Sequence, residues 1–402
     1  IYCHAKAWQL SNFMKKLTFE PRSFSKTRYF PGCAGNPFDR VLHSLDWVES
    51  IPTIIIFFIL ALLAFLGSLP TIIGNQTVFS WWTGFLFAIF LLDWLLIWLL
   101  PVSHRSFGPV KVVVFMLALL RLPFAFLPVY WNVGFEIIGT LLILYGFYYE
   151  PFQIDVHYEQ FSSPKLIEGQ SLRVLHLGDL HLERTTFREK KLLEKINELS
   201  PDLILFSGDV LNLSYLTDPL SLSDAIEFFS KLHAPLGVYG VTGSPAVDFP
   251  DFYGRLAEAT PLQWLDDQIE SLDTASGRIN IIGLTCTHNP DLDEESLKKL
   301  KLPQEGLNIL LHHSPDLSPN ASRYTLDLQL SGHTHGGQVR LPLYGAIFTG
   351  SLYGKTFEAG RYLVNDMPLY ITRGIGMEGA IAPRVRFLTR PEIILWELTN
   401  TP

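Results

Sequence analysis

Apolar residues are concentrated in the first 150 positions of this 402-residue chain, where they form four long stretches. These cover about residues 51–69, 79–100, 110–130 and 133–149. A helix needs roughly 20 mostly apolar residues to cross a bilayer, and the first two stretches meet this length clearly. The third contains Arg121 and Pro123, and the fourth is short with Glu136 near its start, so either is equally compatible with a re-entrant or interfacial element. We therefore predict an all-α transmembrane bundle, a membrane domain at 51–149 with three or four transmembrane helices.

The charges between these stretches predict an orientation. Segment 1–50 and residues 104–111 are basic, whereas residues 67–80 and 128–134 carry no charge. Because Lys and Arg accumulate on the cytoplasmic side, we expect 1–50 to be a basic cytoplasmic N-terminal segment and both ends of the bundle to face the cytoplasm. An ordinary solvated tail is the alternative for this segment. The chain begins at Ile1, and we expect that it starts at Met14 or is a fragment.

Asp93 and Arg121 lie inside apolar stretches. Each of them costs about 2.5–3.5 kcal/mol on insertion scales. We expect Asp93 and Arg121 to pair across two helices, and a lipid headgroup site is the alternative.

After residue 150 the pattern changes to alternating strands and helices. Short apolar runs typical of strands cover residues 154–158, 174–177, 202–211, 236–242, 279–284, 307–311 and 327–330. Thr186 and Glu189 form a capping box that begins one helix, and residues 223–232 form another. This alternation predicts an α/β (α+β) layered core in a domain that covers 150–402.

Aspartate and histidine residues follow the predicted strands. They are Asp179 and His181 after the run at 174–177, Asp209 in the next run, His312 and His313 after 307–311, and His333 and His335 after 327–330. Open α/β sheets keep their ligand sites at this edge. Asp and His ligands suit Mn, Fe or Zn, and two such ions bridged by Asp209 would clamp both oxygens of a phosphoryl transfer. Satisfied core histidines and helix N-caps are the alternative, which explains one such ending better than four.

Composition narrows the function further. The net charge of −8 and the pI near 5.8 argue against nucleic acid as the main partner. The three cysteines, Cys3, Cys33 and Cys286, are far apart and include no CxxC pair. Neither a disulfide framework nor a thiolate zinc site is therefore expected.

Five spaced blocks resemble those of the calcineurin-like metallophosphoesterase family, in its membrane-attached branch. They are GDLH at 178–181, GD at 208–209, HSPD at 313–316, GHTHGGQ at 332–338 and RPEI at 390–393. The resemblance covers about residues 150–398. It implies a four-layered αββα sandwich and hydrolysis of a phosphate ester or anhydride by a metal-held hydroxide.

The resemblance also implies a role for each matching residue. Asp179, His181 and His335 would hold the first metal ion. His313 and His333 would hold the second, and Asp209 would bridge the two. Asp209 and His335 are the expected catalytic residues, and His312 is the less favoured of the adjacent pair.

One block departs from the family pattern. Where the family has a turn of the type Gly-Asn-His-Asp, this chain has Gly243-Ser244-Pro245-Ala246. The family's Asn ligates the second metal, and its His donates a proton or a hydrogen bond to the phosphate. Ser244 is a weak substitute ligand, and Pro245 cannot donate a proton, which costs about 10²–10⁴ in rate when a general acid is needed. Asp248 and Asp251 follow this turn and are candidate replacements, with a plain acidic loop as the alternative.

Three arginines near the end of the domain are candidate phosphate ligands. Arg384 and Arg386 are expected to bind substrate, and Arg373 is a further candidate, because a guanidinium binds phosphate bidentately. Plain surface charges are the alternative.

These observations lead to one function and one alternative. We expect an integral membrane phosphohydrolase of the bacterial inner membrane, with two divalent metal ions and its catalytic domain in the cytoplasm. Its substrate would be lipid-linked or membrane-proximal. The departing turn and the membrane helices narrow the resemblance to UDP-2,3-diacylglucosamine pyrophosphatases of the chlamydial type, which act in lipid A biosynthesis. The alternative is a degenerate phosphoesterase fold that serves as a metal-stabilised binding or scaffold module.

Overall fold

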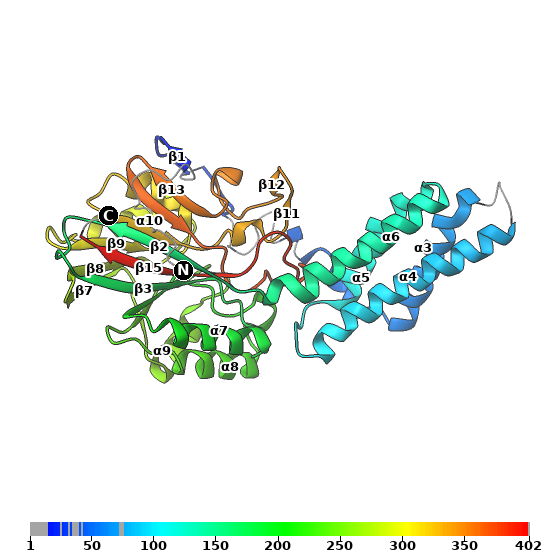
Figure 1. Cartoon of the computed structure of the whole chain (residues 1–402), viewed down its shortest axis with the longest axis horizontal. Coiled ribbons are helices and arrows are strands. Elements are labelled where there is room, and N and C mark those ends of the chain that lie inside the picture. Colours follow the sequence, from blue (N-terminus) through cyan, green and yellow to red (C-terminus); the bar gives the residue numbers. More distant parts are fainter. Residues whose placement is uncertain are drawn as a thin grey trace. The chain divides into compact units, whose positions relative to one another are not determined.

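The computed structural model describes residues 15–24, 26–30, 33, 40–41, 43–71 and 76–400 (Figure 1). Cys3 and the expected start at Met14 lie outside these residues. The chain divides into two compact units that are interleaved in the sequence. The helical unit consists of Arg40–Glu150 and Glu378–Val385, and the sheet unit of the described parts of Ile1–Asp39, Pro151–Met377 and Arg386–Pro402. The first 50 residues, expected to form one segment, are thus shared between the two units.

The helical unit contains five α-helices in the described residues. They are α2 Asp46–Ser50, α3 Thr53–Ser68, α4 Gln76–Val102, α5 Val110–Arg121 and α6 Val129–Ile143, which continues as a π-helical turn through Leu144–Tyr149. Of the described helices, two are long and apolar enough to cross a membrane, at Phe79–Val102 and Tyr130–Phe152.

The first and third expected spans are shorter than predicted. Helix α3 has 16 residues, because Pro52 precedes it and Pro70 lies in the 3-10 turn that follows it. Helix α5 has 12 residues and ends at Arg121, two residues before Pro123. Prolines therefore divide the apolar sequence into shorter helices than hydrophobicity alone predicts.

The expected pairing of Asp93 with Arg121 is present, and Glu136 completes it. The Arg121 guanidinium donates from Nε to Asp93 Oδ2 at 2.7 Å and from Nη2 to Asp93 Oδ1 at 2.8 Å. Its Nη1 donates to Glu136 Oε2 at 2.6 Å. All three side chains are buried, and Gly139 makes room for them, since a Cβ there would lie 2.7 Å from Nη1. The one guanidinium of this cluster is thus paired with two carboxylates, one from α4 and one from α6.

The sheet unit contains two large sheets. The six-stranded sheet has the order β2 Asp155–Ser162, β15 Glu392–Thr399, β3 Ser171–Leu177, β4 Leu203–Phe206, β5 Val238–Gly240 and β6 Leu262–Trp264. The seven-stranded sheet has the order β1 Lys15–Leu17, β13 Gly360–Val364, β14 Met367–Ile371, β10 Leu328–Ser331, β9 Leu307–Leu311, β8 Gly277–Gly283 and β7 Gln268–Thr274. A small hairpin joins β11 Arg340–Leu341 to β12 Gly345–Ala346. Strands β3 to β6 are parallel, as are β8, β9, β10 and β14.

Alternation along β3 shows how the layers are built. Leu172 and Val174 face a core between the two sheets, together with Ile309 and Trp396. The next residue, Leu175, faces the opposite way. It packs in a second core with helices α7 Phe187–Leu199, α8 Pro219–Ser230 and α9 Pro250–Ala259, which lie together on one side of the six-stranded sheet (Figure 1). Helices α10 Pro290–Lys299 and α11 Ser318–Ala321 cover the seven-stranded sheet through a third core. The layers therefore run helix, sheet, sheet, helix.

Candidate active site

The expected ligands lie in tight turns beyond the strand ends. Asp179 and His181 follow β3 with φ of 49° and 39°, and Asp209 follows β4 with φ of 61°. His333 and His335 follow β10 with φ of 72° and 52°. Left-handed backbone costs these non-glycine residues about 1–3 kcal/mol each, and the surrounding contacts must hold them there.

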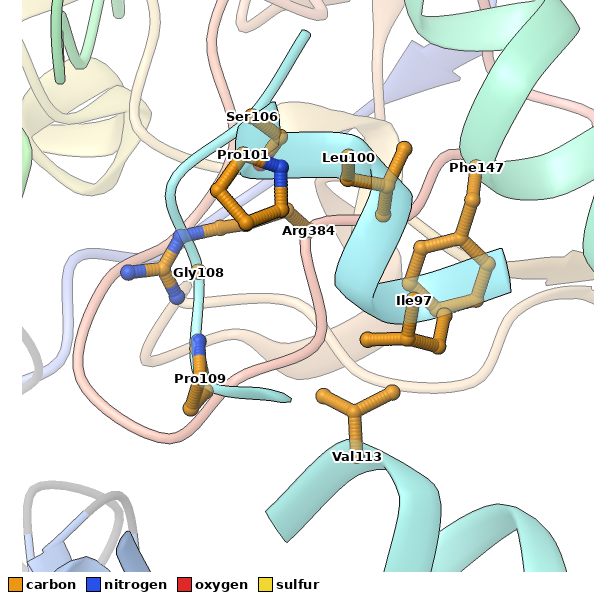
Figure 2. Close-up of a pocket in the computed structure, with 9 residues that line it drawn as sticks. All are labelled: Ile97, Leu100, Pro101, Ser106, Gly108, Pro109, Val113, Phe147 and Arg384. Atoms are coloured by element: carbon orange, nitrogen blue, oxygen red, sulfur yellow. The ribbon is translucent and has the colours of Figure 1, made fainter. Parts of the chain in front are cut away.

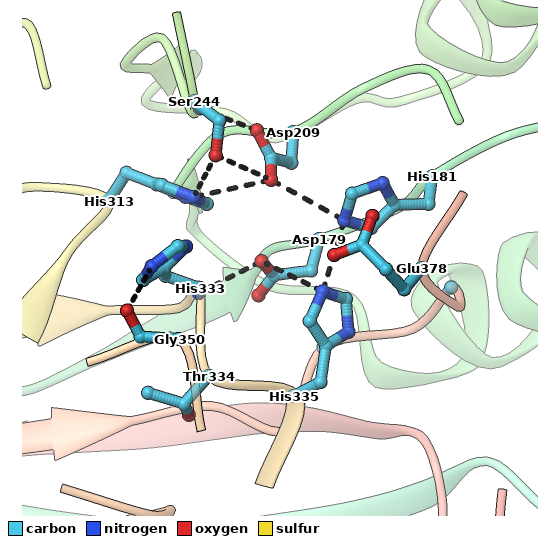
Figure 3. A network of polar contacts seen from close by, with 12 residues as sticks. Asp179, His181, Asp209, Ser244, His313, His333, Thr334, His335, Gly350 and Glu378 are labelled. Carbon is cyan, nitrogen blue, oxygen red and sulfur yellow. Dashed lines mark hydrogen bonds and ion pairs between the residues drawn. The ribbon is translucent and has the colours of Figure 1, made fainter. Parts of the chain in front are cut away.

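A first cluster consists of Asp179, His181 and His335, whose ligand atoms all lie within 4.8 Å of one another (Figure 3). The Nε2 atoms of the two histidines face each other at 3.1 Å. Asp179 Oδ2 is buried without a hydrogen-bond partner, whereas Oδ1 accepts from the His333 backbone N–H at 2.9 Å. A cation between these atoms would stabilise both the facing ring nitrogens and the unpartnered carboxylate oxygen. This donor set therefore fits a divalent metal ion.

A second cluster consists of His313, His333 and a histidine that the sequence analysis did not name, His288. His313 Nδ1 donates to the Ser207 carbonyl at 2.8 Å, and His333 Nε2 donates to the Gly350 carbonyl at 3.1 Å. Metal-binding histidines usually donate their second ring N–H in this way, which fixes the tautomer and aims the other nitrogen at the metal.

Asp209 lies between the two clusters. Its Oδ2 is 3.4 Å from His181 Nε2 and 3.3 Å from His313 Nε2 (Figure 3). One carboxylate oxygen within reach of both histidines suits a bridging ligand, as the sequence predicted for this residue.

Burial and charge set the protonation of these groups. Burial keeps the pKa of His335 well below its usual value, and His181 and Arg386 lower it further. Burial likewise lowers the pKa of His333 to about 3. Burial raises the pKa of Asp209, but the charge of His313 outweighs this effect and holds that pKa well below the usual value. Neutral histidines and an ionised bridging carboxylate are the forms that bind metal. His333, His335 and Asp209 are in these forms. Burial lowers the pKa of His313, but the charge of Asp209 outweighs this effect and raises that pKa to about 9, so a metal ion would take the place of its proton.

The departing turn contacts this site directly. The Ser244 backbone N–H donates to Asp209 Oδ1 at 2.6 Å. Ser244 Oγ lies 3.2 Å from Asp209 Oδ2, 3.4 Å from His313 Nε2 and 3.0 Å from His288 Nε2. The structure therefore brings the serine to the second cluster, where its hydroxyl hydrogen-bonds the other ligands.

Asp248 is not a replacement acid. Its carboxylate accepts hydrogen bonds from the backbone N–H groups of Asp209 at 2.8 Å, Val210 at 3.1 Å and Gly243 at 2.8 Å. Burial and the charge of Asp209 raise its pKa to about 6. Both oxygens are used to hold the Asp209 turn against the Gly243 turn. The side chain of Asp251 is outside the described part of the structure.

His312 points away from the clusters. Its Nδ1 donates to the Ser314 carbonyl at 2.8 Å, and its Nε2 lies 3.2 Å from Asp293 Oδ2. The preference for His313 over His312 as the ligand agrees with this geometry.

The expected role of Arg386 in substrate binding is wrong. Its side chain is fully buried, and its guanidinium donates to the backbone carbonyls of Gly376, Thr389 and Arg373. Gly376 in turn donates its N–H to the Asp179 carbonyl at 2.7 Å. The guanidinium is thus saturated by main-chain acceptors, and the residue supports the loop behind a metal ligand.

Arg384 does not meet the expectation either. It belongs to the helical unit, is 2% exposed, and donates to the carbonyls of Ala380 and Ala382. Figure 2 shows it beside Pro101, Gly108 and Pro109, in a cavity of about 10 Å³. Such a cavity holds roughly one water molecule and no phosphate. Arg373 is paired with Glu392 at 2.6 Å. Arg384 and Arg386, expected to bind phosphate, thus donate to backbone carbonyls.

His288 was missed although a signal for it existed. It lies five residues beyond β8, and Asn289 next to it caps α10. The sequence Thr-His-Asn-Pro is typical of a helix start, which hid the histidine within an ordinary capping turn.

Comparisons with known proteins identify relatives of this chain. The family model described as calcineurin-like phosphoesterase matches residues 172–337. The uncharacterized metallophosphoesterase YkuE of Bacillus subtilis is 33% identical over 268 residues, which cover 64% of this chain and 90% of the relative. The UDP-2,3-diacylglucosamine pyrophosphatase LpxG of Chlamydia trachomatis is 27% identical over 297 residues, covering 59% and 87%. A transmembrane protein with a metallophosphoesterase domain from Danio rerio is 28% identical over 283 residues, covering 64% and 60%.

Proposed function

Since this chain belongs to the calcineurin-like metallophosphoesterases, we propose that it is a membrane-anchored two-metal phosphohydrolase that cleaves the pyrophosphate bond of UDP-2,3-diacylglucosamine. The membrane would be the bacterial inner membrane, with the sheet unit on its cytoplasmic side and the reaction a step of lipid A biosynthesis.

The position of Asp209 carries the proposal. One of its oxygens lies 3.4 Å from His181 and 3.3 Å from His313, one residue of each histidine cluster. Asp179, His181 and His335 would hold one divalent ion, and His313 and His333 the other. When bound, such ions neutralise charge on a phosphoryl group and lower the pKa of a bound water. Mn, Fe and Zn all suit this donor set.

The departing turn supports an anhydride as the substrate. Pro245 stands where the family has a proton-donating His, and Asp248 is fully used by backbone N–H groups. Loss of a general acid matters least for a leaving group that departs readily as an anion. A nucleoside monophosphate leaving from a pyrophosphate is such a group, whereas an alkoxide is not.

The helical unit and the similarity to LpxG support a lipid substrate. Two helices of this unit are long and apolar enough to cross a membrane. LpxG is named for its action on UDP-2,3-diacylglucosamine, whose two acyl chains reside in a bilayer. Anchoring the site at the membrane surface would bring it to such a substrate.

Release of UMP from UDP-2,3-diacylglucosamine by the detergent-purified chain with added Mn tests the proposal. Asp209→Ala should lower the rate at least ~100-fold, which corresponds to about 2.7 kcal/mol. Asp273→Ala is the matched control, because it removes a surface carboxylate paired with Arg278 and should leave the rate unchanged.

A model phosphodiester run in parallel separates the other outcomes. Cleavage of this diester alone would keep the hydrolase and discard the lipid substrate. Metal binding without turnover of either compound would favour a binding or scaffold module.

A further inference from the structure

We propose that His288 is a ligand of the second metal ion, beside His313 and His333, and that it supplies the coordination that the 243–246 turn lacks. This inference rests on the proposed two-metal function. His288 lies 42 positions or more after the 243–246 turn in the sequence. In the folded chain, however, it contacts this turn through Ser244.

Burial and contacts place His288 inside the cluster. Its side chain is 2% exposed, and its ring centroid lies 4.3 Å from that of His333 and 5.7 Å from that of His313. The ligand nitrogens of the three rings lie within 4.8 Å of one another. His288 Nδ1 is buried without a hydrogen-bond partner, and Nε2 has Ser244 Oγ at 3.0 Å. An imidazole buried with an unsatisfied nitrogen is costly unless a further ligand is bound there.

The loop holds His288 in a fixed orientation. The Thr287 N–H donates to Asp293 Oδ1 at 3.0 Å, and the Asn289 side chain accepts from the Asp291 N–H at 3.1 Å. Both neighbours of His288 are thus tied to helix α10. His288 itself has φ of 58°, which costs a non-glycine residue about 1–3 kcal/mol. In this conformation the ring is buried against His313 and His333.

The three rings and Asp209 together form a donor set for one cation. His313 and His333 each donate one ring N–H to a backbone carbonyl, so the other nitrogen of each ring is the one left to bind an ion. His288 adds a third imidazole, and Asp209 Oδ2 lies 3.3 Å from His313 Nε2. Three imidazoles and one carboxylate are a donor set typical of Mn, Fe or Zn.

Ser244 is the weaker candidate for the same position. Its hydroxyl contacts Asp209, His313 and His288 at 3.0–3.4 Å, as a hydrogen-bonding neighbour of ligands would. A neutral hydroxyl is a poorer donor to these metals than an imidazole. The serine would therefore orient His288 and Asp209 while the histidine binds the ion.

Manganese binding to the whole 402-residue chain tests the inference. The stoichiometry and affinity are measured by titration, and electron paramagnetic resonance distinguishes a coupled ion pair from a single ion. The variants are His288→Ala and His288→Gln, and the glutamine keeps a polar group near Ser244 in case alanine fails to fold. His233→Ala is the matched control, since His233 is exposed.

The wild type and His233→Ala are expected to bind two ions and give the coupled signal. Both His288 variants should keep one ion and bind the second at least 10–100-fold more weakly, because even residues behind the ligands contribute that much. Two ions of wild-type affinity in the His288 variants would overturn the inference, as would a larger loss of affinity for the second ion in Ser244→Ala than in either His288 variant.

If the proposed hydrolase function is wrong, the metal titration and the activity assay give different answers. A wild type that binds two ions but cleaves no phosphate substrate would remove the hydrolase and leave the role of His288 to be decided by the same titration.

Discussion

Gly243 packs against the bridging carboxylate, and substituting it tests how tightly the site is packed. A Cβ at Gly243 would lie 2.1 Å from Asp209 Oδ1 and 2.3 Å from the Asp209 backbone N, distances that real Cβ atoms essentially never show. Both neighbours are held: Ser244 N–H donates to Oδ1, and Asp248 accepts from the backbone N–H groups of Asp209 and Gly243. Gly243→Ala must therefore move the Asp209 turn by about 1 Å.

Such a shift should lower both the activity and the stability of the protein. Misplacing a reacting group by about 1 Å lowers the rate roughly 10²-fold, or about 2.7 kcal/mol of transition-state stabilisation. Overpacking a core by one methyl group destabilises a fold by about 1–3 kcal/mol. Manganese-dependent hydrolysis of an aryl phosphodiester and thermal unfolding measure the two effects.

The same substitution at Gly254 is the matched control. Gly254 lies inside α9, and a Cβ there would meet nothing within 4 Å. Alanine is better than glycine in a helix by about 0.5–1 kcal/mol, so Gly254→Ala should raise the melting temperature without changing activity. Wild-type activity in Gly243→Ala would contradict this prediction, because the Asp209 turn would then accept the added Cβ without moving.

Two further predictions concern buried charges away from the metal ligands. Arg121→Met leaves Asp93 and Glu136 buried without their cation, which should destabilise the helical unit by about 3–5 kcal/mol in detergent unfolding. Adding Asp93→Asn and Glu136→Gln should recover most of this loss, and an unchanged single variant would contradict the pairing. Burial raises the pKa of Asp316 to about 6, above the usual value near 3.9. The stability contributed by its protonated form is full below about pH 4 and lost as the pH rises through 6, so Asp316→Asn should gain up to ~3 kcal/mol over the wild type between pH 4 and 7. Urea unfolding at several pH values measures this difference, and a constant difference would exclude it.

The ligands on β3, β4, β9 and β10 could be predicted because local sequence determines where they lie. Each follows a short apolar run that is buried in the structure, and β3 with β4 and β9 with β10 are parallel neighbours. Parallel pairing brings the carboxyl ends of neighbouring strands to one edge. Asp179 and Asp209 therefore had to be near each other once the strands were recognised.

The loop between β13 and β14 has a sequence signal for a hairpin that hydrophobic periodicity does not detect. The hairpin of β13 and β14 turns through Asn365 and Asp366, with φ of 46° and 69°. Two left-handed residues of this type are the usual signature of a two-residue hairpin loop. Strand β1 had no such signal, because the three residues Lys-Lys-Leu pair with β13 only through tertiary contact.

Arg384 and Arg386 show a different limit. From sequence, a cation near the end of a domain is expected at the surface or on a phosphate, since burial requires partners for five N–H groups. Arg386 finds those partners among the carbonyls of three separate residues, Gly376, Thr389 and Arg373. Only the folded backbone brings these carbonyls together, so no local pattern could have indicated them.

Backbone conformation separates His288 from an ordinary core histidine. Five of the seven expected ligands share the left-handed region with His288, namely Asp179, His181, Asp209, His333 and His335. His313 and Ser244 lie outside this region. A capping turn before α10 needs no such strain at His288, because Asn289 supplies the cap in extended conformation, with φ of −107°. Strain of about 1–3 kcal/mol persists where the surroundings impose it, and it concentrates at functional sites. The conformation that His288 shares with these five ligands agrees with the proposed role in metal binding, which the manganese titration measures directly.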